Sequence, residues 1–211
     1  MNIHTILFDL DGTLIDTNAL INASFLHTFE QYNLTFTHEE ILEFNGPPLI
    51  ETFQMIDPIK ANSMLETYRK HNLAEHDHYV TAFPQVIETI EQLHKQKFQL
   101  GIVSTKMSKS VQMGLKLTGL DRFLKTVITF DDVTNPKPHA EPVLKAMEAL
   151  GANAATTLMV GDNHHDIESG KNAGVMTAGV AWSAKGKERL LTYEPTYMLD
   201  EMTDLLKIVG V

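Results

Sequence analysis

Short apolar runs alternate with helical patterns through most of the chain, and this alternation restricts its possible folds more than any other feature. The runs, several of them rich in β-branched residues, cover residues 3–8, 99–103, 126–130, 157–160 and 176–180, with a weaker one at 196–199. Between them, apolar residues recur at helical spacing after Pro84 and again up to Gly151. Strands that alternate with helices form a parallel sheet covered on both faces. The sequence therefore predicts an α/β fold with a doubly wound parallel sheet.

Residues 16–83 interrupt this alternation. Apolar positions such as Leu20, Phe25 and Phe29 indicate helices there, and Gly46-Pro47-Pro48 and Asp57-Pro58 divide the segment into successive short ones. The segment leaves the sheet after the first strand and returns before the second. We therefore expect an all-helical insert on a core formed by residues 1–15 and 84–211, with a hinge at the two crossing points.

Charge and composition exclude several classes of protein. The 211 residues include 17 Lys and Arg against 27 Asp and Glu, a net charge of −10 that repels nucleic acids and anionic lipids. The absence of cysteine excludes disulfides and thiolate metal sites. No signal-peptide pattern or membrane-spanning run occurs, so we expect a cytoplasmic protein without membrane or nucleic acid partners. A small phosphorylated substrate stays compatible, because local cations or a metal can reverse the charge within a cleft.

Two carboxylates follow the first apolar run, in the pentapeptide Asp9-Leu10-Asp11-Gly12-Thr13. Successive strand residues point to opposite faces, but a turn at Gly12 lets the carboxylates of Asp9 and Asp11 converge beyond the strand end. Two nearby carboxylates can act as an ionised nucleophile and a protonated acid if their surroundings separate their pKa values. The alternative interpretation is a strand followed by a simple Asp-Gly turn.

A second pair of carboxylates follows the fourth run, in Gly161-Asp162-Asn163-His164-His165-Asp166. Asp162 and Asp166 stand four residues apart, on one face of a helix if it begins by Asn163. Their oxygens suit Mg²⁺, which proteins hold with one or two carboxylates together with water and phosphate. One alternative is that Asp162 only caps this helix. Another is a zinc site at His164 and His165, but further ligands at suitable spacing are missing, which favours surface histidines.

Hydroxyl and ammonium groups follow two other runs. Ser104, Thr105 and Lys106 come after the second run, and Lys137 comes after the third. Such groups at the ends of successive strand–helix units can bind phosphoryl oxygens and neutralise their charge. Taken singly, Ser104 is also explained as a helix N-cap and Lys137 as a solvated lysine.

The expected strand order brings these motifs together. In an open doubly wound sheet, the ligand crevice lies outside the carboxyl ends of the strands, where the strand order reverses. With the order 3-2-1-4-5, the first and fourth strands are neighbours, and Asp9 and Asp162 lie side by side. The sequence thus predicts a single site at this edge of the sheet.

Along the chain, the four motifs resemble those of the haloacid dehalogenase superfamily. They are Asp9-Leu10-Asp11-Gly12-Thr13, Ser104, Lys137, and Gly161-Asp162 with Asp166. The helical insert is similar to the C1-type cap of that superfamily, so the resemblance covers the whole chain. Asp11 is typical of its phosphatase branch. Ser104 stands where many relatives have Thr, which retains the hydroxyl.

The resemblance implies an Mg²⁺-dependent phosphatase that forms an aspartyl-phosphate. It makes Asp9 the nucleophile and Asp11 the acid that protonates the departing oxygen and then activates water. Ser104 and Lys137 would be catalytic residues that hold the transferring group. The metal ligands that it implies are Asp9, the backbone carbonyl of Asp11, Asp162, and Asp166 as a ligand or a support.

Within the superfamily, segments such as Phe44-Asn45-Gly46-Pro47 resemble inorganic pyrophosphatases linked to dephosphorylation of the serine-phosphorylated carrier protein HPr. The implied reaction is hydrolysis of pyrophosphate to phosphate. Phosphoglycolate phosphatase, or a broader phosphomonoesterase, is the alternative. A mutase shares the motifs, and the intact set of catalytic residues argues against a binding protein without activity.

Substrate choice would depend on the helical insert and the cleft beneath it. The expected substrate-binding residues are Ser104, Thr105, Lys137 and Arg69, of which Arg69 offers a bidentate guanidinium. Further candidates near the cleft are Asn18, Gly46, Lys70 and Lys106, whereas Lys60 is expected on a solvated helix face. The sequence His76-Asp77-His78 is expected in a solvated turn.

Overall fold

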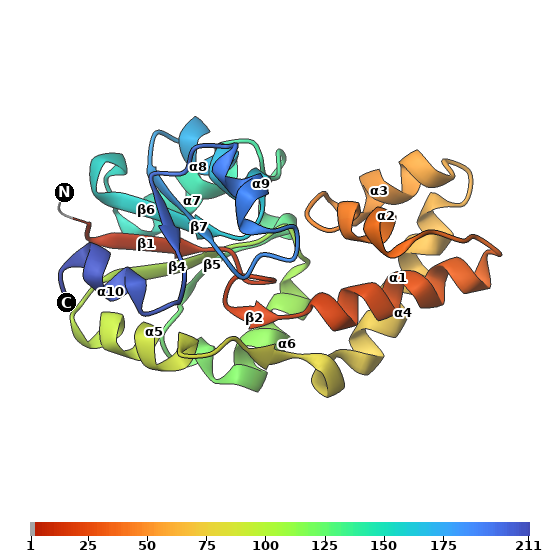
Figure 1. Cartoon of the computed structure of the whole chain (residues 1–211), viewed down its shortest axis with the longest axis horizontal. Helices are drawn as coiled ribbons and strands as arrows, with labels where there is room; N and C mark the ends of the chain where they lie inside the picture. Colours follow the sequence, from red (N-terminus) through yellow and green to blue (C-terminus); the bar gives the residue numbers. More distant parts are fainter. Residues whose placement is uncertain (1–2) are drawn as a thin grey trace.

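A computed structural model describes residues 3–211, in which a helix-covered sheet lies beside a group of helices (Figure 1). The sheet has six strands in the order β5-β4-β1-β6-β7-β8, and every neighbouring pair is parallel. This confirms the expected order 3-2-1-4-5 and adds the weaker last strand at one edge. The strands are β1 (Thr5–Phe8), β4 (Gln99–Val103), β5 (Thr126–Ile128), β6 (Thr157–Gly161), β7 (Met176–Val180) and β8 (Tyr197–Leu199).

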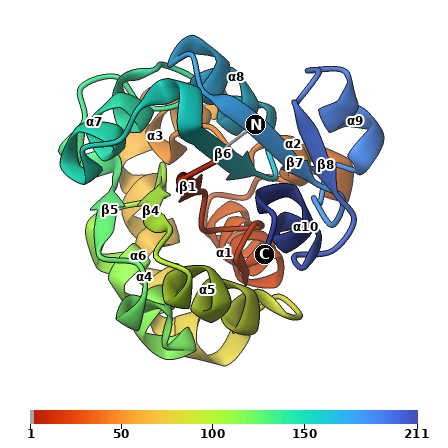
Figure 2. The ribbon, with the colours of Figure 1, turned by 90° about the vertical axis from the view of Figure 1, so that its left-hand side faces the viewer.

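Helices cover both faces of the sheet (Figure 2). One face packs against α5 (Val86–Lys95), α6 (Ser108–Thr118) and α10 (Asp204–Val209), and the other against α7 (Glu141–Leu150) and α8 (His164–Asn172). The central strand β1 is buried throughout, with Ile6 and Phe8 in one apolar cluster and Leu7 in the other. Burial on two faces explains the continuous apolar run at β1. The helix α9 (Lys187–Leu191) follows β7.

Strand β5 is shorter than the sequence predicted. It ends at Ile128, because the Asp132 carboxylate accepts hydrogen bonds from the backbone N–H and the hydroxyl of Thr129 at 2.8 and 2.6 Å. This capping box starts a 3-10 helix at Phe130–Asp132. Two more 3-10 helices lie at Leu120–Arg122 and Ala154–Thr156.

Four helices separate β1 from α5 in the chain: α1 (Asn18–Gln31), α2 (His38–Glu43), α3 (Leu49–Ile56) and α4 (Ala61–Tyr79). The predicted breaks are present, since Gly46-Pro47-Pro48 separates α2 from α3 and Asp57-Pro58 separates α3 from α4. The expectation of short helices is wrong for α1 and α4, which have 14 and 19 residues. Packing extends them: they contact each other along their length, and the rings of Phe25 and Tyr68 lie 4.8 Å apart in a separate apolar core.

The sequence His76-Asp77-His78 lies in the last turn of α4 and not in a solvated turn. The side chain of His76 is fully buried, and α4 packs there against α6. Gly114 of α6 lies at this contact: a methyl group there would come within 2.8 Å of Ile15 Cδ1 and would make an ordinary contact, 3.7 Å, with Nε2 of His76. Tertiary packing therefore buries His76, whereas Asp77 and His78 stay exposed.

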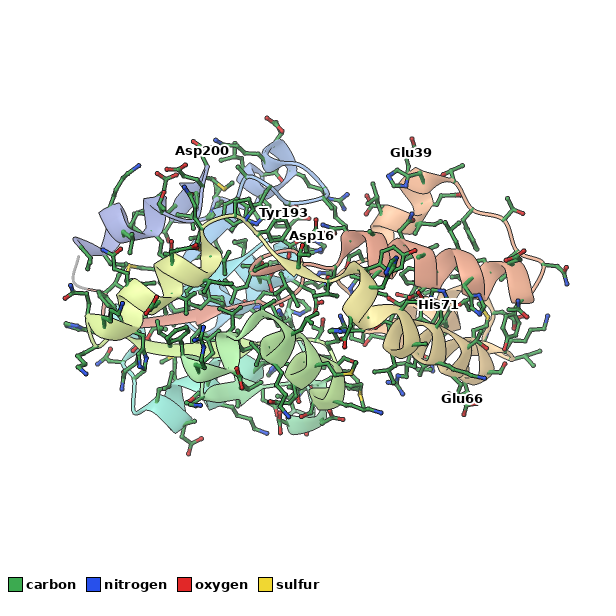
Figure 3. All side chains as sticks on the ribbon, turned by 90° about the horizontal axis from the view of Figure 1, so that it is seen from below. Asp16, Glu39, Glu66, His71, Tyr193 and Asp200 are labelled. Carbon is green, nitrogen blue, oxygen red and sulfur yellow. The ribbon has the colours of Figure 1, made fainter. Side chains whose placement is uncertain are left out.

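The two chain crossings pair with each other, a feature that the sequence did not predict. Strands β2 (Ile15–Asp16) and β3 (Thr81–Ala82) form a two-stranded antiparallel sheet, with Asp16 opposite Thr81. Figure 3 shows Asp16 where the sheet part and the helical part meet, whereas Glu39 and Glu66 project from the helical part. Strands of two residues are too short for a periodic signal. Within residues 3–211, no helix is long and apolar enough to cross a bilayer.

Candidate active site

The carboxyl ends of β4, β1 and β6 open into a cavity of about 280 Å³. Asp9, Ser104 and Asp162 follow these three strands directly and line its floor together with Lys137. The helical part supplies the opposite wall, which includes the rings of Phe44 and Tyr68. The predicted convergence of the four motifs at one edge of the sheet is therefore present.

Lys137 connects two of the carboxylates. Its ammonium donates hydrogen bonds to Asp9 Oδ1 at 2.7 Å, to Asp166 Oδ1 at 2.6 Å and to the carbonyl of Val103 at 2.9 Å. Its side chain is only 3% exposed. Burial by itself would lower the pKa of the Lys137 ammonium, but Asp166 and Asp9 raise it above its ordinary value. Lys137 is therefore a fully charged ammonium at neutral pH and not the solvated lysine of the alternative interpretation.

Three buried carboxylates, those of Asp9, Asp162 and Asp166, each place an oxygen within 4.8 Å of the others. Burial raises the pKa of Asp9 to about 7, with Lys137 opposing and Asp166 and Asp11 adding to the rise. Burial and the nearby Asp9 also raise the pKa of Asp162 well above its ordinary value. Lys137 alone thus provides too little positive charge for the three carboxylates. Their oxygen atoms are the ligands that a hard divalent cation prefers.

The turn after β1 shapes the position of Asp162. Gly12 has φ +83°, and a methyl group there would lie 2.5 Å from Asp162 Oδ2. The hydroxyl of Thr13 donates to Asp162 Oδ1 at 3.4 Å, and that of Ser183 donates to the Asp162 carbonyl at 2.7 Å. Glycine is therefore required for its backbone conformation and also for its lack of a side chain.

The start of α8 orients Asp166. The N-cap is Asn163, so the interpretation of Asp162 as the cap is wrong. Asp166 closes a capping box by accepting the backbone N–H of Asn163 on Oδ2 at 2.9 Å, which leaves Oδ1 for Lys137. Both oxygens of Asp166 are thus committed to neighbours within the site.

The segment after β4 carries three polar side chains into the cavity. Ser104 is not a helix cap, since α6 begins at Ser108 with Met107 as its N-cap. The hydroxyl of Thr105 donates to the carbonyl of Gly46 at 3.4 Å, which joins this segment to the loop between α2 and α3. The ammonium of Lys106 donates to Asp11 Oδ1 at 2.6 Å.

The candidates from the helical part divide into two groups. Arg69 and Gly46 line the cavity, and Nε of Arg69 is buried without a hydrogen-bond partner within the described residues. Lys60 is exposed and pairs with Asp57 at 3.6 Å. Lys70 is also exposed, and Asn18 donates to Asp16 at 3.0 Å. These last three residues do not line the cavity.

Comparison with known proteins identifies the family. The family model of the haloacid dehalogenase-like hydrolases matches residues 6–180. The chain belongs to this family. A pyrophosphatase PpaX from Oceanobacillus iheyensis is 59% identical over 210 residues, which cover 100% of this chain and 98% of that protein. Another pyrophosphatase PpaX, from Anoxybacillus flavithermus, is 58% identical over 212 residues, which cover 100% of this chain and 99% of that protein.

Solved structures agree with this assignment. A haloacid dehalogenase-like hydrolase from Streptococcus pneumoniae shares 25% identity and a TM-score of 0.87, over 98% of both chains. The structure of a predicted phosphatase from Clostridium acetobutylicum, at 21% identity, has a TM-score of 0.89 and covers 100% of both chains, which shows the common fold. The resemblance drawn from the four motifs is confirmed, and the chain is a hydrolase.

Sequence reasoning missed several residues of this haloacid dehalogenase-like site. Asn163 donates through Nδ2 to the carbonyl of Asn45 at 3.2 Å, which links α8 to the loop of the helical part. Asn72 lies one helical turn beyond Arg69 on the same cavity wall and is buried. The spacing of one helical turn from Arg69 was the one sequence feature that could have indicated Asn72.

The histidines of α8 do not form a metal site. Within residues 3–211, they belong to no cluster of three or more ligand side chains, and burial lowers the pKa of His165 to about 4.

Proposed function

We propose that this hydrolase converts inorganic pyrophosphate to phosphate through an aspartyl-phosphate on Asp9, with Mg²⁺ as cofactor. The observation that carries this proposal is the buried ammonium of Lys137 between Asp9 and Asp166, beside the carboxylate of Asp162. The choice of pyrophosphate is supported by the PpaX relatives at 59% and 58% identity over essentially their full length. A link to HPr and a cytoplasmic location remain predictions.

The residues proposed to hold Mg²⁺ are Asp9, Asp162 and the backbone carbonyl of Asp11. Asp166 fits the role of a support better than that of a ligand, because Lys137 and the N–H of Asn163 already occupy its two oxygens. When bound, Mg²⁺ would supply positive charge to the phosphoryl oxygens and to the carboxylates. The raised pKa of Asp9 and of Asp162 supports this role, since both indicate missing positive charge.

In the proposed first step, an Asp9 oxygen attacks one phosphorus of pyrophosphate, and the bond from that phosphorus to the bridging oxygen breaks. The Asp11 carboxyl gives its proton to the bridging oxygen, which leaves with the second phosphorus as orthophosphate. Lys137 keeps Asp9 in place and neutralises charge on the phosphoryl group in transit, to which the Ser104 hydroxyl donates a hydrogen bond.

In the second step, Asp11 is a carboxylate and takes a proton from water as the water oxygen attacks phosphorus. The bond between phosphorus and the Asp9 oxygen breaks, which releases the second orthophosphate and restores both aspartates. One residue thus serves as acid and then as base, as the two half-reactions require.

We propose that residues 16–83 form a cap and that residues 1–15 and 84–211 form the catalytic core. The apolar cluster around Phe25 and Phe53 is separate from the clusters on the sheet, which supports this division. Arg69 and Thr105 are proposed to contact substrate in the cleft between the two. Closure over the cleft would keep bulk water from the phosphoryl group.

Phosphate release from pyrophosphate, phosphoglycolate and a panel of sugar phosphates, with Mg²⁺ or with EDTA, tests the proposal. We expect release from pyrophosphate to dominate and to vanish in EDTA. A clear preference for phosphoglycolate or another ester would overturn the choice of substrate but keep the mechanism. Release without an acceptor sugar counts against a mutase.

Metal removal has a predicted effect on stability that depends on pH. Folding raises the pKa of Asp9 to about 7, so the folded chain retains a proton that the unfolded chain has lost. The stability that this bound proton confers is lost as the pH rises through the pKa that Asp9 has in the folded chain. We expect the free energy of unfolding of the metal-free chain to fall by on the order of 1 kcal/mol between about pH 6 and about pH 8.

The measurement is the melting temperature in EDTA and in Mg²⁺ at both pH values. Because Mg²⁺ competes with the proton for the same carboxylates, added Mg²⁺ should raise the melting temperature more at the higher pH. An equal rise at both values would contradict the proposed metal ligands.

A further inference from the structure

Lys106 contacts the residue that the mechanism assigns as the acid. Its ammonium lies 2.6 Å from Asp11 Oδ1, and the two side chains are 17% and 14% exposed. The backbone of Lys106 is fixed on both sides, because its N–H donates to Ser104 Oγ at 3.1 Å and its carbonyl accepts from Phe130 at 3.0 Å. The side chain therefore starts from a fixed point and reaches the place where the leaving oxygen receives its proton.

The other lysine on the cavity floor has no free N–H donor for the departing phosphate. An ammonium has three N–H donors, and those of Lys137 are used by Asp9, Asp166 and the Val103 carbonyl. Within the described residues, Asp11 is the one hydrogen-bond partner of the Lys106 ammonium. Two donors of Lys106 are thus available to a substrate at the Asp11 end of the cavity.

Substrates differ in the charge of the leaving group that would lie at the Asp11 end of the cavity. The second phosphate of pyrophosphate is an anion before and after cleavage, whereas an alcohol or phenol that leaves with the Asp11 proton is neutral. An ammonium beside Asp11 attracts the first kind far more than the second. We propose that Lys106 is a specificity-determining residue that selects substrates with an anionic leaving group. The proposal rests on the proposed function and adds the group that recognises the departing phosphate.

The test compares two substrates that both need the acid, pyrophosphate and phenyl phosphate, in the full-length protein with Mg²⁺. Lys106→Gln should lower kcat/KM for pyrophosphate by roughly 10- to 100-fold, the range expected for a lost charged hydrogen bond. The loss for phenyl phosphate should be several times smaller. Lys106→Arg should retain most of the preference for pyrophosphate. Lys116→Gln, at an exposed position of α6, is the matched control.

The loss of kcat/KM for pyrophosphate, divided by that for phenyl phosphate, shows whether Lys106 recognises the leaving phosphate or only supports Asp11. If Lys106 only positioned Asp11, the Gln variant would lose the same factor on both substrates, and the proposal would be wrong. An unchanged kcat/KM for pyrophosphate would also overturn it.

Binding gives a readout that needs no turnover. In calorimetric titrations with Mg²⁺, Lys106→Gln should weaken the affinity for imidodiphosphate, a pyrophosphate analogue, by a similar factor and leave that for phenylphosphonate nearly unchanged. If the unaltered protein does not hydrolyse pyrophosphate, the proposed function fails. The role of Lys106 is then decided by these titrations, and equal affinities of the variant and the unaltered protein for imidodiphosphate would refute it.

Discussion

Replacement of Asp9 by Asn is expected to reduce phosphate release by at least about 10⁴-fold, because an amide oxygen cannot form the aspartyl-phosphate. The fold should persist. Asn has nearly the same shape, and its oxygen can still accept the hydrogen bond that Lys137 donates at 2.7 Å. Its neutral side chain also avoids the cost of a buried charge and the repulsion from Asp166 and Asp11, which together raise the pKa of Asp9.

Three measurements check this expectation: phosphate release with Mg²⁺, phosphate incorporated into acid-quenched protein, and the melting temperature. The variant should lose turnover and incorporation but melt at or above the temperature of the unaltered protein. The control is Asp200→Asn, which removes an exposed carboxylate on the sheet part of the molecule (Figure 3). Substantial turnover by Asp9→Asn would refute Asp9 as the nucleophile.

Lys137→Met is the second substitution with a large expected effect, on both stability and activity. It leaves the buried carboxylates of Asp9 and Asp166 without their shared ammonium. Removal of one partner from a buried ion pair costs about 3–5 kcal/mol in the free energy of unfolding. Activity should fall by about 10³-fold or more, since the transferring group loses the buried ammonium on the cavity floor.

Urea unfolding with EDTA measures the stability loss. A double variant, Lys137→Met with Asp166→Asn, is the matched control, because it removes one uncompensated charge together with the lysine. It should recover part of the lost stability but none of the activity. If the single and double variants unfolded at the same urea concentration, the ion pair would not be the source of the loss.

The order of the sheet could be predicted because its strands are buried on both faces. The short, largely apolar runs at β1, β4 and β7 indicate such strands, and the rules for parallel crossovers then leave few strand orders. The order 3-2-1-4-5, expected of a doubly wound sheet, places Asp9 beside Asp162. The site follows from topology, because parallel strands end at the same edge.

The details that could not be predicted depend on contacts between distant segments. The burial of His76 depends on the packing of α4 against α6, whose Gly114 lies 38 positions later in the sequence. The capping role of Asn163 depends on which residue first adopts helical geometry, and Asp162 was an equally good cap by residue type. The intrinsic conformational preferences of single residues differ too little in free energy to decide between such alternatives, so tertiary packing decides them.

The sequence by itself determined the α/β class, the strand order and the set of acidic, hydroxyl and lysine side chains at one edge of the sheet. The class and the set of side chains follow from hydrophobic periodicity and from the polar residues at the strand ends, which are local properties of the chain. The strand order follows from the topology expected of a doubly wound sheet. Only the tertiary structure decided which charges pair: Lys137 with Asp9 and Asp166, and Lys106 with Asp11. The physical reason is that electrostatic energies depend on distance and burial, and only the folded chain sets both.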